Sequence, residues 1–361
     1  MTLVGRTAGL PRHELAAGPM TAQIRRDVLV VGASAGGVEA LRALVAGLPA
    51  DLPAAVLVVL HIPAAGADAL AAILDRSGPL PAQRARDGDP LEPGRILVAV
   101  PDHHLLVLDG RVALSRGPRE NGHRPAVDVL FRSAARALGP RVVGLVLSGA
   151  LDDGAAGSVA VVERGGVVLA QDPDEALHSG MPLACVAATG APVAPVAELT
   201  ARVTGLLGQP VEGVTAPPPT RLMDMETAMA GMDPDALESL DRPGHPSGFS
   251  CPDCHGVLFQ IEEGQLRRFR CRVGHAWSVE SLLAEHGEAV EGALWMALRS
   301  LEEKAALSAQ LAGSAHDAGR SLTEGRFADQ AREAQSAAEL IRRMLVSTPS
   351  VQLSQDSAAG A

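Results

Sequence analysis

The sequence predicts an α/β domain with a mainly parallel, doubly wound sheet, flanking helices and a β-hairpin, followed by a small Cys/His module and a helical hairpin. Between residues 27 and 207, short runs of Val, Leu and Ile alternate with Ala- and Leu-rich stretches of helical spacing. Continuous apolar runs are typical of strands buried on both faces, and their alternation with helices is typical of a parallel sheet. Beyond residue 248, a stretch with three cysteines is followed by two amphipathic segments.

The expected strands and helices follow one another along the first region. The strands are expected in the runs DVLVVGAS, AAVLVVLHIP, GRILVAVPD, RVVGLVLSGA and GGVVLAQD. The helices are expected in VEALRALVAGLP, DALAAILDRSG, AVDVLFRSAARALG and GSVAVVERG. One stretch departs from this alternation. In HHLLVLDGRVALSRG, two short apolar runs meet at Asp109-Gly110, which predicts the β-hairpin.

Length and composition limit the classes of protein to consider. A chain of 361 residues is long enough for one large core and a smaller module. Aromatic residues make up only 2% and Tyr is absent, so we expect a core of Ala, Val and Leu. The formal charge of −11 argues against binding to nucleic acid or to anionic membranes. No apolar stretch has the length of a signal peptide or a membrane span, so we expect a cytoplasmic protein without membrane insertion.

Changes in composition predict the boundaries between regions. The predicted regions are an N-terminal tail (1–26), the α/β domain (27–207), a Pro-rich linker (208–248), the Cys/His module (249–280), the helical hairpin (281–346) and a disordered tail (347–361). Within the linker we expect one or two helical turns in TRLMDMETAMAG. The hairpin is predicted from apolar residues at spacings of three and four, namely Val290, Leu294, Leu298, Leu301 and Ala305, then Phe327, Ala331, Ala334, Ala338, Ile341 and Leu345.

The segment GASAGG at 32–37 follows the first expected strand and opens the first helix, and it has three interpretations. A dinucleotide-binding turn requires G-x-G-x-x-G, but Ser34 stands at the middle glycine, and His61 stands where an acidic residue for the ribose is wanted. A serine at this position also commonly caps a helix. The match to G-x-S-x-G instead indicates a nucleophile on a strand-to-helix turn.

A base and an orienting acid are available at the ends of two other strands. His61 ends the second strand, and Asp152 and Asp153 follow the strand RVVGLVLSGA. Because the carboxyl ends of parallel strands meet at one edge of a sheet, these side chains are expected beside Ser34. Each residue also has a structural interpretation: a buried histidine, or an aspartate that caps a helix. The pattern alone leaves both aspartates open, and the order Ser, His, Asp differs from that of the common α/β hydrolases.

Five blocks in the first region resemble the catalytic domain of the chemotaxis protein-glutamate methylesterases, the CheB family. The blocks, in chain order, are GASAGGVEAL, LHIP, RPAVDVLFRSAA, LSGALDDGAAG and QDPDEALHSGMP. The resemblance implies a serine-type carboxylic ester hydrolase in which Ser34 is the nucleophile, His61 the base and Asp153, rather than Asp152, the orienting acid. It implies hydrolysis of glutamyl methyl esters on methyl-accepting chemoreceptors, and also glutamine deamidation, in chemotaxis or a related signal transduction pathway. No cofactor is expected for catalysis.

The chain departs from the family pattern in three places. Ala35 stands where the family commonly has Thr, and Ala150 where it commonly has Met. If the Thr hydroxyl assists the base or the oxyanion, Ala35 puts the catalytic rate in question, whereas the backbone donors at Ala150 remain. Only 26 residues precede the first strand, so we expect no receiver domain and no control by phosphorylation. The rival interpretation is a non-catalytic signalling scaffold that retains the esterase fold and acts through its C-terminal region. The presence of Ser34, His61 and Asp153 together argues against this rival.

The Cys/His module has the spacing of a structural zinc site. Cys251 and Cys254 form C-x2-C, and after sixteen residues Cys271 and His275 form C-x3-H. Three thiolates and one imidazole make a closed tetrahedral set, so the metal is expected to stabilise the fold rather than to catalyse. His255 and His286 are alternative fourth ligands. Cys185 stands alone and is expected to be a small buried apolar residue.

The amphipathic pair at 281–346 indicates a surface for other proteins. Both docking to a helical partner and self-association remain open from the sequence.

Overall fold

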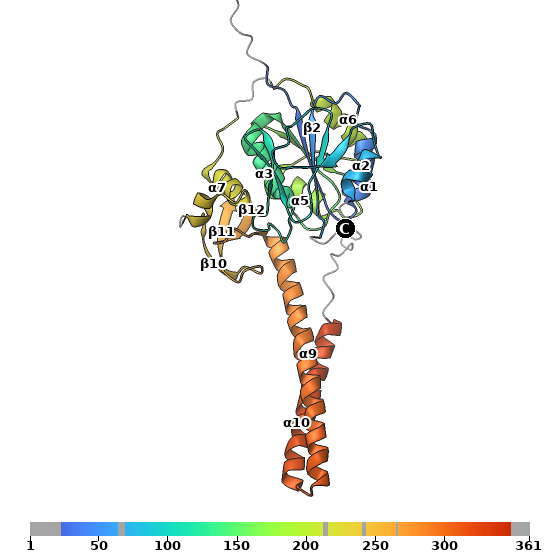
Figure 1. Ribbon diagram of the computed structural model, residues 1–361, viewed down its shortest axis with the longest axis vertical. Coiled ribbons are helices and arrows are strands. Elements are labelled where there is room, and N and C mark those ends of the chain that lie inside the picture. The colour runs from blue at the N-terminus through green and yellow to red at the C-terminus, as the bar shows by residue number, and fades with distance from the viewer. Residues whose placement is uncertain (1–22, 64–68, 212–215, 240–242, 265, 348–361) are drawn as a thin grey trace, which may run out of the picture.

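The computed structural model describes residues 23–63, 69–211, 216–239, 243–264 and 266–347 (Figure 1). These residues form an α/β domain, a small antiparallel sheet beside it and a long pair of helices that extends away from both (Figure 1). Most of the predicted tails, residues 1–22 and 348–361, lies outside the described residues.

The α/β domain is built on a seven-stranded sheet in which every neighbouring pair is parallel. The strand order is β3-β4-β2-β1-β7-β8-β9. The strands are β1 (Val28–Ala33), β2 (Ala55–Leu60), β3 (Ala82–Arg84), β4 (Ile96–Val98), β7 (Val142–Val146), β8 (Val167–Gln171) and β9 (Val193–Ala194). The five predicted runs are all present, and the predicted parallel α/β fold is confirmed.

Helices cover both faces of the sheet. They are α1 (Gly37–Ala46), α2 (Leu70–Asp75), α3 (Val127–Leu138), α4 (Ala155–Glu163), α5 (Gly180–Thr189) and α6 (Val196–Leu206). Residues of β1 alternate between two apolar cores: Leu29 and Val31 pack with α1, α2 and α6, whereas Val30 packs with α3 and α4. A strand buried on both faces has no polar side, which explains the continuous apolar run.

The predicted β-hairpin is present as β5 (His104–Leu108) and β6 (Arg111–Ser115). Its turn residues Asp109 and Gly110 have φ angles of 50° and 73°, which is the conformation that a two-residue hairpin turn needs. The hairpin packs on α3, where the Ser133 hydroxyl accepts a hydrogen bond from the Val107 amide.

The region predicted as a linker holds more helix than the one or two turns expected. It contains α7 (Arg221–Ala230) and α8 (Pro234–Glu238), while residues 212–215 and 240–242 lie outside the described residues. The helix α7 begins where the Thr220 side chain accepts a hydrogen bond from the Met223 amide. Met223 is buried in the core on the α3 side of the sheet, and this tertiary contact explains why α7 extends over ten residues.

The C-terminal region consists of a four-stranded antiparallel sheet and two long helices. The strands are β10 (His245–Ser250), β11 (Val257–Glu263), β12 (Leu266–Cys271) and β13 (Ala276–Ser278). The helix α9 (Val279–Asp317) starts directly after β13, and α10 (Ser321–Ser347) returns beside it (Figure 1). Small buried residues such as Ala305, Ala334 and Ala338 let the two helices approach closely. No described helix is long and apolar enough to span a lipid bilayer.

Candidate active site

The order of the strands places three chain segments at one point of the sheet edge. Ser34 follows β1, His61 follows β2, and Asp153 lies in the loop between β7 and α4. The strands β2 and β7 flank β1 on opposite sides, so the chain reverses its direction of progress across the sheet at this point. In open α/β sheets, ligand and catalytic sites form at such a reversal, beyond the carboxyl ends of the strands.

The three predicted residues are connected by hydrogen bonds. His61 Nδ1 lies 3.0 Å from Ser34 Oγ, and His61 Nε2 lies 2.7 Å from Asp153 Oδ2. Because a carboxylate only accepts, the proton of the neutral ring sits on Nε2, and Nδ1 is left to accept the Ser34 hydroxyl. Ser34 is half-buried, whereas the His61 and Asp153 side chains are only 6% and 2% exposed. This is the arrangement of a nucleophile, a base and an orienting acid.

The glycines around Ser34 are required by the geometry of the turn. Gly36 has a φ of 70°, in the left-handed region that favours glycine. A Cβ at Gly32 would lie 2.2 Å from Val127 Cγ1, so only glycine permits α3 to pack this closely on β1. The Ser34 amide donates to the Ser148 carbonyl at 2.9 Å, which fixes the turn that carries Ser34 to the chain just after β7.

Asp153 is held by four hydrogen bonds that keep it ionised. Besides His61, the amides of Val127 and Asp128 donate to it at 2.6 and 3.2 Å, and the Asn121 side chain donates at 3.0 Å. Burial alone would raise the pKa of Asp153, but the hydrogen bonds from His61 and the Val127 amide lower that pKa well below the usual range.

Three further side chains contact this group, and the sequence did not identify them. Asn121 donates to Asp153 and, at 3.1 Å, to Asp128. Burial and the charge of Asp153 raise the pKa of Asp128 well above its usual value. His123 stacks on the His61 ring with centroids 3.7 Å apart, and burial lowers the pKa of His123 to about 4. The only sequence signal here is the Asn-Gly turn at 121–122, which says nothing about a contact 32 residues away.

Asp152, the alternative acid, contacts the C-terminal region and not His61. It accepts hydrogen bonds from the hydroxyls of Ser278 at 2.6 Å and Ser281 at 3.0 Å. Burial and a hydrogen bond with Glu280 raise the pKa of Asp152 to about 7.

The four predicted metal ligands also lie together. The ligand atoms of Cys251, Cys254, Cys271 and His275 are all within 4.8 Å of one another. Within the described residues, neither His255 nor His286 belongs to this group. Cys254 Sγ lies 3.6 Å from Cys271 Sγ, and His275 Nδ1 lies 3.5 Å from Cys271 Sγ. This cluster could hold a metal ion. Cys185 is buried elsewhere, beside Ser158.

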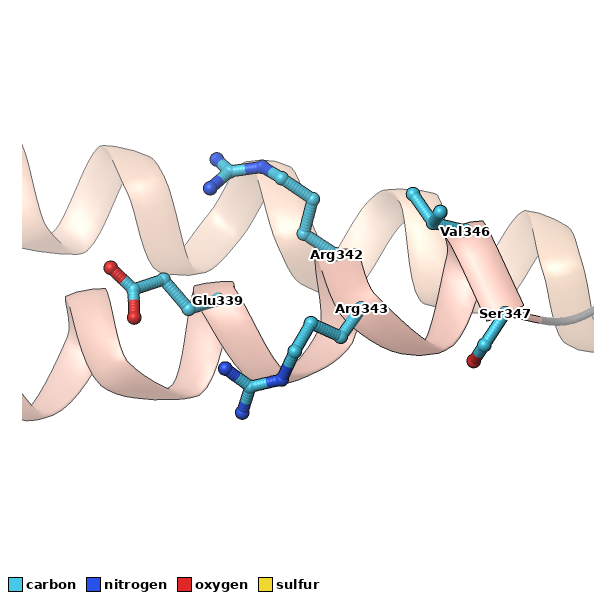
Figure 2. Close-up of a pocket in the computed structure, with 5 residues that line it drawn as sticks. All are labelled: Glu339, Arg342, Arg343, Val346 and Ser347. Carbon is cyan, nitrogen blue, oxygen red and sulfur yellow. The ribbon is translucent and has the colours of Figure 1, made fainter.

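A hollow of about 680 Å³ on α10 lies in the helical pair, apart from both sites. Figure 2 shows its lining residues, Glu339, Arg342, Arg343, Val346 and Ser347, along one stretch of α10. No base lies next to Ser347 among these lining residues, so the hollow lacks the pair that a serine nucleophile needs, and Ser34 is the better candidate for an active site.

Comparison with known proteins identifies the α/β domain. The sequence pattern of the family described as CheB methylesterase matches residues 29–203. The chain contains a CheB methylesterase domain. Ser34, His61 and Asp153 all lie within it, whereas the Cys/His cluster and the helical pair lie beyond its C-terminal end.

Curated proteins similar to this domain are named as protein-glutamate methylesterases. A Methanosarcina mazei protein named protein-glutamate methylesterase/protein-glutamine glutaminase 2 is 42% identical over 165 residues, which are 44% of this chain and 45% of the relative. A Nocardioides protein named protein-glutamate methylesterase/protein-glutamine glutaminase is 44% identical over 183 residues, 50% of this chain and 49% of the relative. The chain therefore spans about half the length of the curated relatives it matches. The crystal structure of the Thermotoga maritima CheB methylesterase catalytic domain is 31% identical, with a TM-score of 0.48, and covers 50% of this chain and 98% of that one.

Proposed function

We propose that the chain is a protein-glutamate methylesterase acting on glutamyl methyl esters of methyl-accepting chemoreceptors, in chemotaxis or a related pathway. The observation that carries the proposal is the double hydrogen bond of His61, to Ser34 on one ring nitrogen and to Asp153 on the other. The methylesterase domain and the names of its relatives support the choice of substrate.

The geometry supports a two-step acyl transfer. Ser34 Oγ attacks the ester carbonyl while His61 Nδ1 takes the hydroxyl proton, and the ionised Asp153 stabilises the resulting imidazolium. The tetrahedral intermediate then collapses, and His61 returns the proton to the departing methoxide, which leaves as methanol. Water, activated by His61, hydrolyses the glutamyl-Ser34 ester and regenerates the hydroxyl. The same attack on a glutamine amide would release ammonia, as in deamidation.

Hydrolysis of a methylated receptor fragment, or of a generic ester, by the full chain tests this proposal. We expect Ser34→Ala to lower kcat by about a thousandfold or more. Ser77→Ala is the matched control, because the Ser77 hydroxyl donates to the Ile73 carbonyl just beyond the end of α2, away from Ser34. Equal rates for Ser34→Ala and the wild type would favour the non-catalytic scaffold instead.

We propose a structural zinc ion for Cys251, Cys254, Cys271 and His275. A tetrahedral site with Zn–S bonds of about 2.3 Å and a Zn–N bond of about 2.0 Å places sulfurs about 3.8 Å apart and sulfur and nitrogen about 3.5 Å apart. The distances of 3.6 Å and 3.5 Å fit this geometry. Metal analysis of purified protein should find zinc in the wild type and in Cys185→Ser, and a loss of zinc in Cys254→Ser. Unchanged zinc in Cys254→Ser would contradict this ligand set.

The helical pair within residues 281–346 is proposed as an interaction surface, either for a helical partner or for a second copy of the chain. Large apolar side chains on α9 support this, because Val290, Met296 and Leu307 are each more than half exposed. Light scattering of the wild type and of Met296→Lys separates the two cases. Self-association predicts a wild-type mass above that of one chain and a lower mass for Met296→Lys, whereas docking of a different partner predicts the mass of one chain for both.

A further inference from the structure

We propose that the C-terminal sheet is part of the active-site scaffold: through Ser278 it fixes the side-chain amide of Asn121, which in turn holds Asp153 against His61. In this role Asn121 is a positioning residue, since it acts on the reaction through Asp153. The inference rests on the proposed hydrolysis at Ser34 and extends it to a part of the chain outside the methylesterase domain.

The backbone makes the first connection between the two regions. The Ala276 amide donates to the Arg119 carbonyl at 3.2 Å, and the Asn121 amide donates to the Ala276 carbonyl at 2.8 Å. Residue 120 thus pairs in parallel with residue 276, so the loop before α3 continues the small sheet beyond its edge strand β13. An edge strand carries unpaired backbone groups, and here the catalytic domain supplies their partners.

The side chain of Asn121 makes the second connection. Its Oδ1 accepts a hydrogen bond from the Ser278 amide at 2.8 Å, while its NH2 group donates to Asp153 and to Asp128. Every polar function of this buried amide is therefore used. A flipped amide would turn Oδ1 toward two carboxyl groups and NH2 toward the Ser278 N–H. The Ser278 amide thus specifies the orientation in which Asn121 donates to Asp153.

A cluster of buried charges holds the sheet in this position. Glu120, next to Asn121, accepts hydrogen bonds from Arg132 on α3 at 2.6 Å and from Arg270 on β12 at 3.0 Å. Glu226 on α7 accepts from Arg270 at 3.0 Å and from Arg268 at 2.9 Å. All five side chains are less than 10% exposed. Moving the sheet away would leave buried charges without partners, so the contact is expected to persist in solution.

The start of α9 also contacts the loop between β7 and α4, which carries Asp152 and Asp153. The hydroxyls of Ser278 and Ser281 donate to Asp152, which directly precedes Asp153. The neighbouring aspartate is thereby tied to the same short segment of the C-terminal region as Asn121. A continuous path of hydrogen bonds of 3.0 Å or less runs from Ser34 through His61, Asp153 and Asn121 to Ser278.

Comparing Ser278→Pro with Ser278→Ala isolates the hydrogen bond that carries the inference. Both variants lose the hydroxyl contacts with Asp152, but only proline also removes the amide N–H that binds Asn121. Ser278 has a φ of −75°, within the range that the proline ring adopts, and Trp277 before it lies in an extended strand. We expect kcat for Ser34-dependent ester hydrolysis to be about tenfold lower in Ser278→Pro than in Ser278→Ala, with KM changed by less than about twofold.

Asn121→Gly tests the same path from its middle. Asn121 has a φ of 52°, which glycine adopts without strain, so the variant removes the amide and keeps the turn. We expect a similar fall in kcat, and no further fall when Ser278→Pro is added, because both changes break one path. Asp109→Gly, at a φ of 50° in the distant hairpin, is the matched control and should keep the wild-type kcat.

The possible failures are distinguishable. If Ser34→Ala hydrolyses the ester as fast as the wild type, the proposed function fails. If hydrolysis depends on Ser34 but Ser278→Pro equals Ser278→Ala, or if the losses of Ser278→Pro and Asn121→Gly simply add, the positioning path is wrong. Should Ser278→Pro not fold, Asn121→Gly decides, and a wild-type kcat in that variant overturns the inference. Thermal unfolding of each variant shows whether it is folded, and the kcat values then decide between the remaining cases.

Discussion

Replacing Glu226 with Gln removes the carboxylate that three guanidinium groups share. The Glu226 side chain is 1% exposed and lies 2.9 Å from Arg268, 3.0 Å from Arg270 and 3.7 Å from Arg132. Burial alone would raise the pKa of Glu226, but the charges of these arginines lower it well below its usual range, so the group is ionised. The neutral Gln side chain of similar size would leave the buried cluster with an uncompensated positive charge.

The magnitude follows from the burial of the cluster. Removing one partner of a buried ion pair destabilises a protein by about 3–5 kcal/mol. Asp224 lies two residues earlier on α7 and pairs with Arg136 at 2.6 Å, but these side chains are 48% and 37% exposed. Exposed pairs contribute about 0–1 kcal/mol. We therefore expect Glu226→Gln to lower the free energy of unfolding by at least about 2 kcal/mol more than the matched control Asp224→Asn.

Urea denaturation of the full chain measures this difference. In a Trp295→Phe background, fluorescence reports on Trp277 alone, which is buried in the small sheet. Circular dichroism follows the helices in the same samples. Losses within about 1 kcal/mol of each other for Glu226→Gln and Asp224→Asn would refute the view that buried charges hold the small sheet to the α/β domain.

Two further predictions concern the core. Burial lowers the pKa of His104 to about 4, so the unfolded chain, with a histidine pKa near about 6.5, takes up this proton first as the pH falls. The free energy of unfolding therefore falls as the pH drops from about 6.5 to 4, and it is about 2 kcal/mol lower at pH 5. In urea denaturation, the midpoints at pH 7 and pH 5 should differ less for His104→Gln than for the wild type. The same pH dependence in both proteins would count against His104 as the cause. Gly32→Ala should destabilise by about 1–3 kcal/mol, because its Cβ would overlap Val127, whereas Gly292→Ala on α9 meets no atom within 4 Å and should be neutral or stabilising in the same assay.

The fold was predictable, and Ser34 and His61 could be singled out as candidates, because each leaves a local pattern in the sequence, whereas the choice of Asp153 over Asp152 depended on the resemblance to the CheB family. Strands buried on both faces must be continuously apolar, and parallel strands must all end at one edge. A serine, a histidine and an aspartate at three such ends are therefore brought near one another by topology alone. The grouping of Cys251, Cys254, Cys271 and His275 was predictable for a similar reason, because two cysteine-containing turns at this spacing have few uses other than metal binding.

No local sequence pattern predicts the contacts between the α/β domain and the small sheet. Arg268 and Arg270 alternate along β12, as they would on the solvent face of an isolated hairpin, and only the packed structure shows that this face is buried. Their partner Glu226 is more than 40 residues away, in a region whose prolines and glycines predict a linker. Asn121 and Ser278 are 157 residues apart. Pairings at these separations depend on the assembled fold, which no local pattern encodes.

The Cys/His cluster lies next to β13, the strand that supplies Ser278 to the proposed positioning path. Cys271 ends β12 and His275 directly precedes β13, so the ligand cluster encloses the turn between them. Arg270 also donates to the Gly274 carbonyl in this turn at 2.7 Å, which ties the buried charges to the ligand loop. The conformation of that turn sets where β13 runs, and hence where the Ser278 amide meets Asn121. A metal ion bound by these four residues would therefore influence the proposed hydrolysis only through the geometry of the backbone, because the proposed mechanism assigns the bond changes to Ser34 and the proton transfers to His61, with Asp153 stabilising the imidazolium.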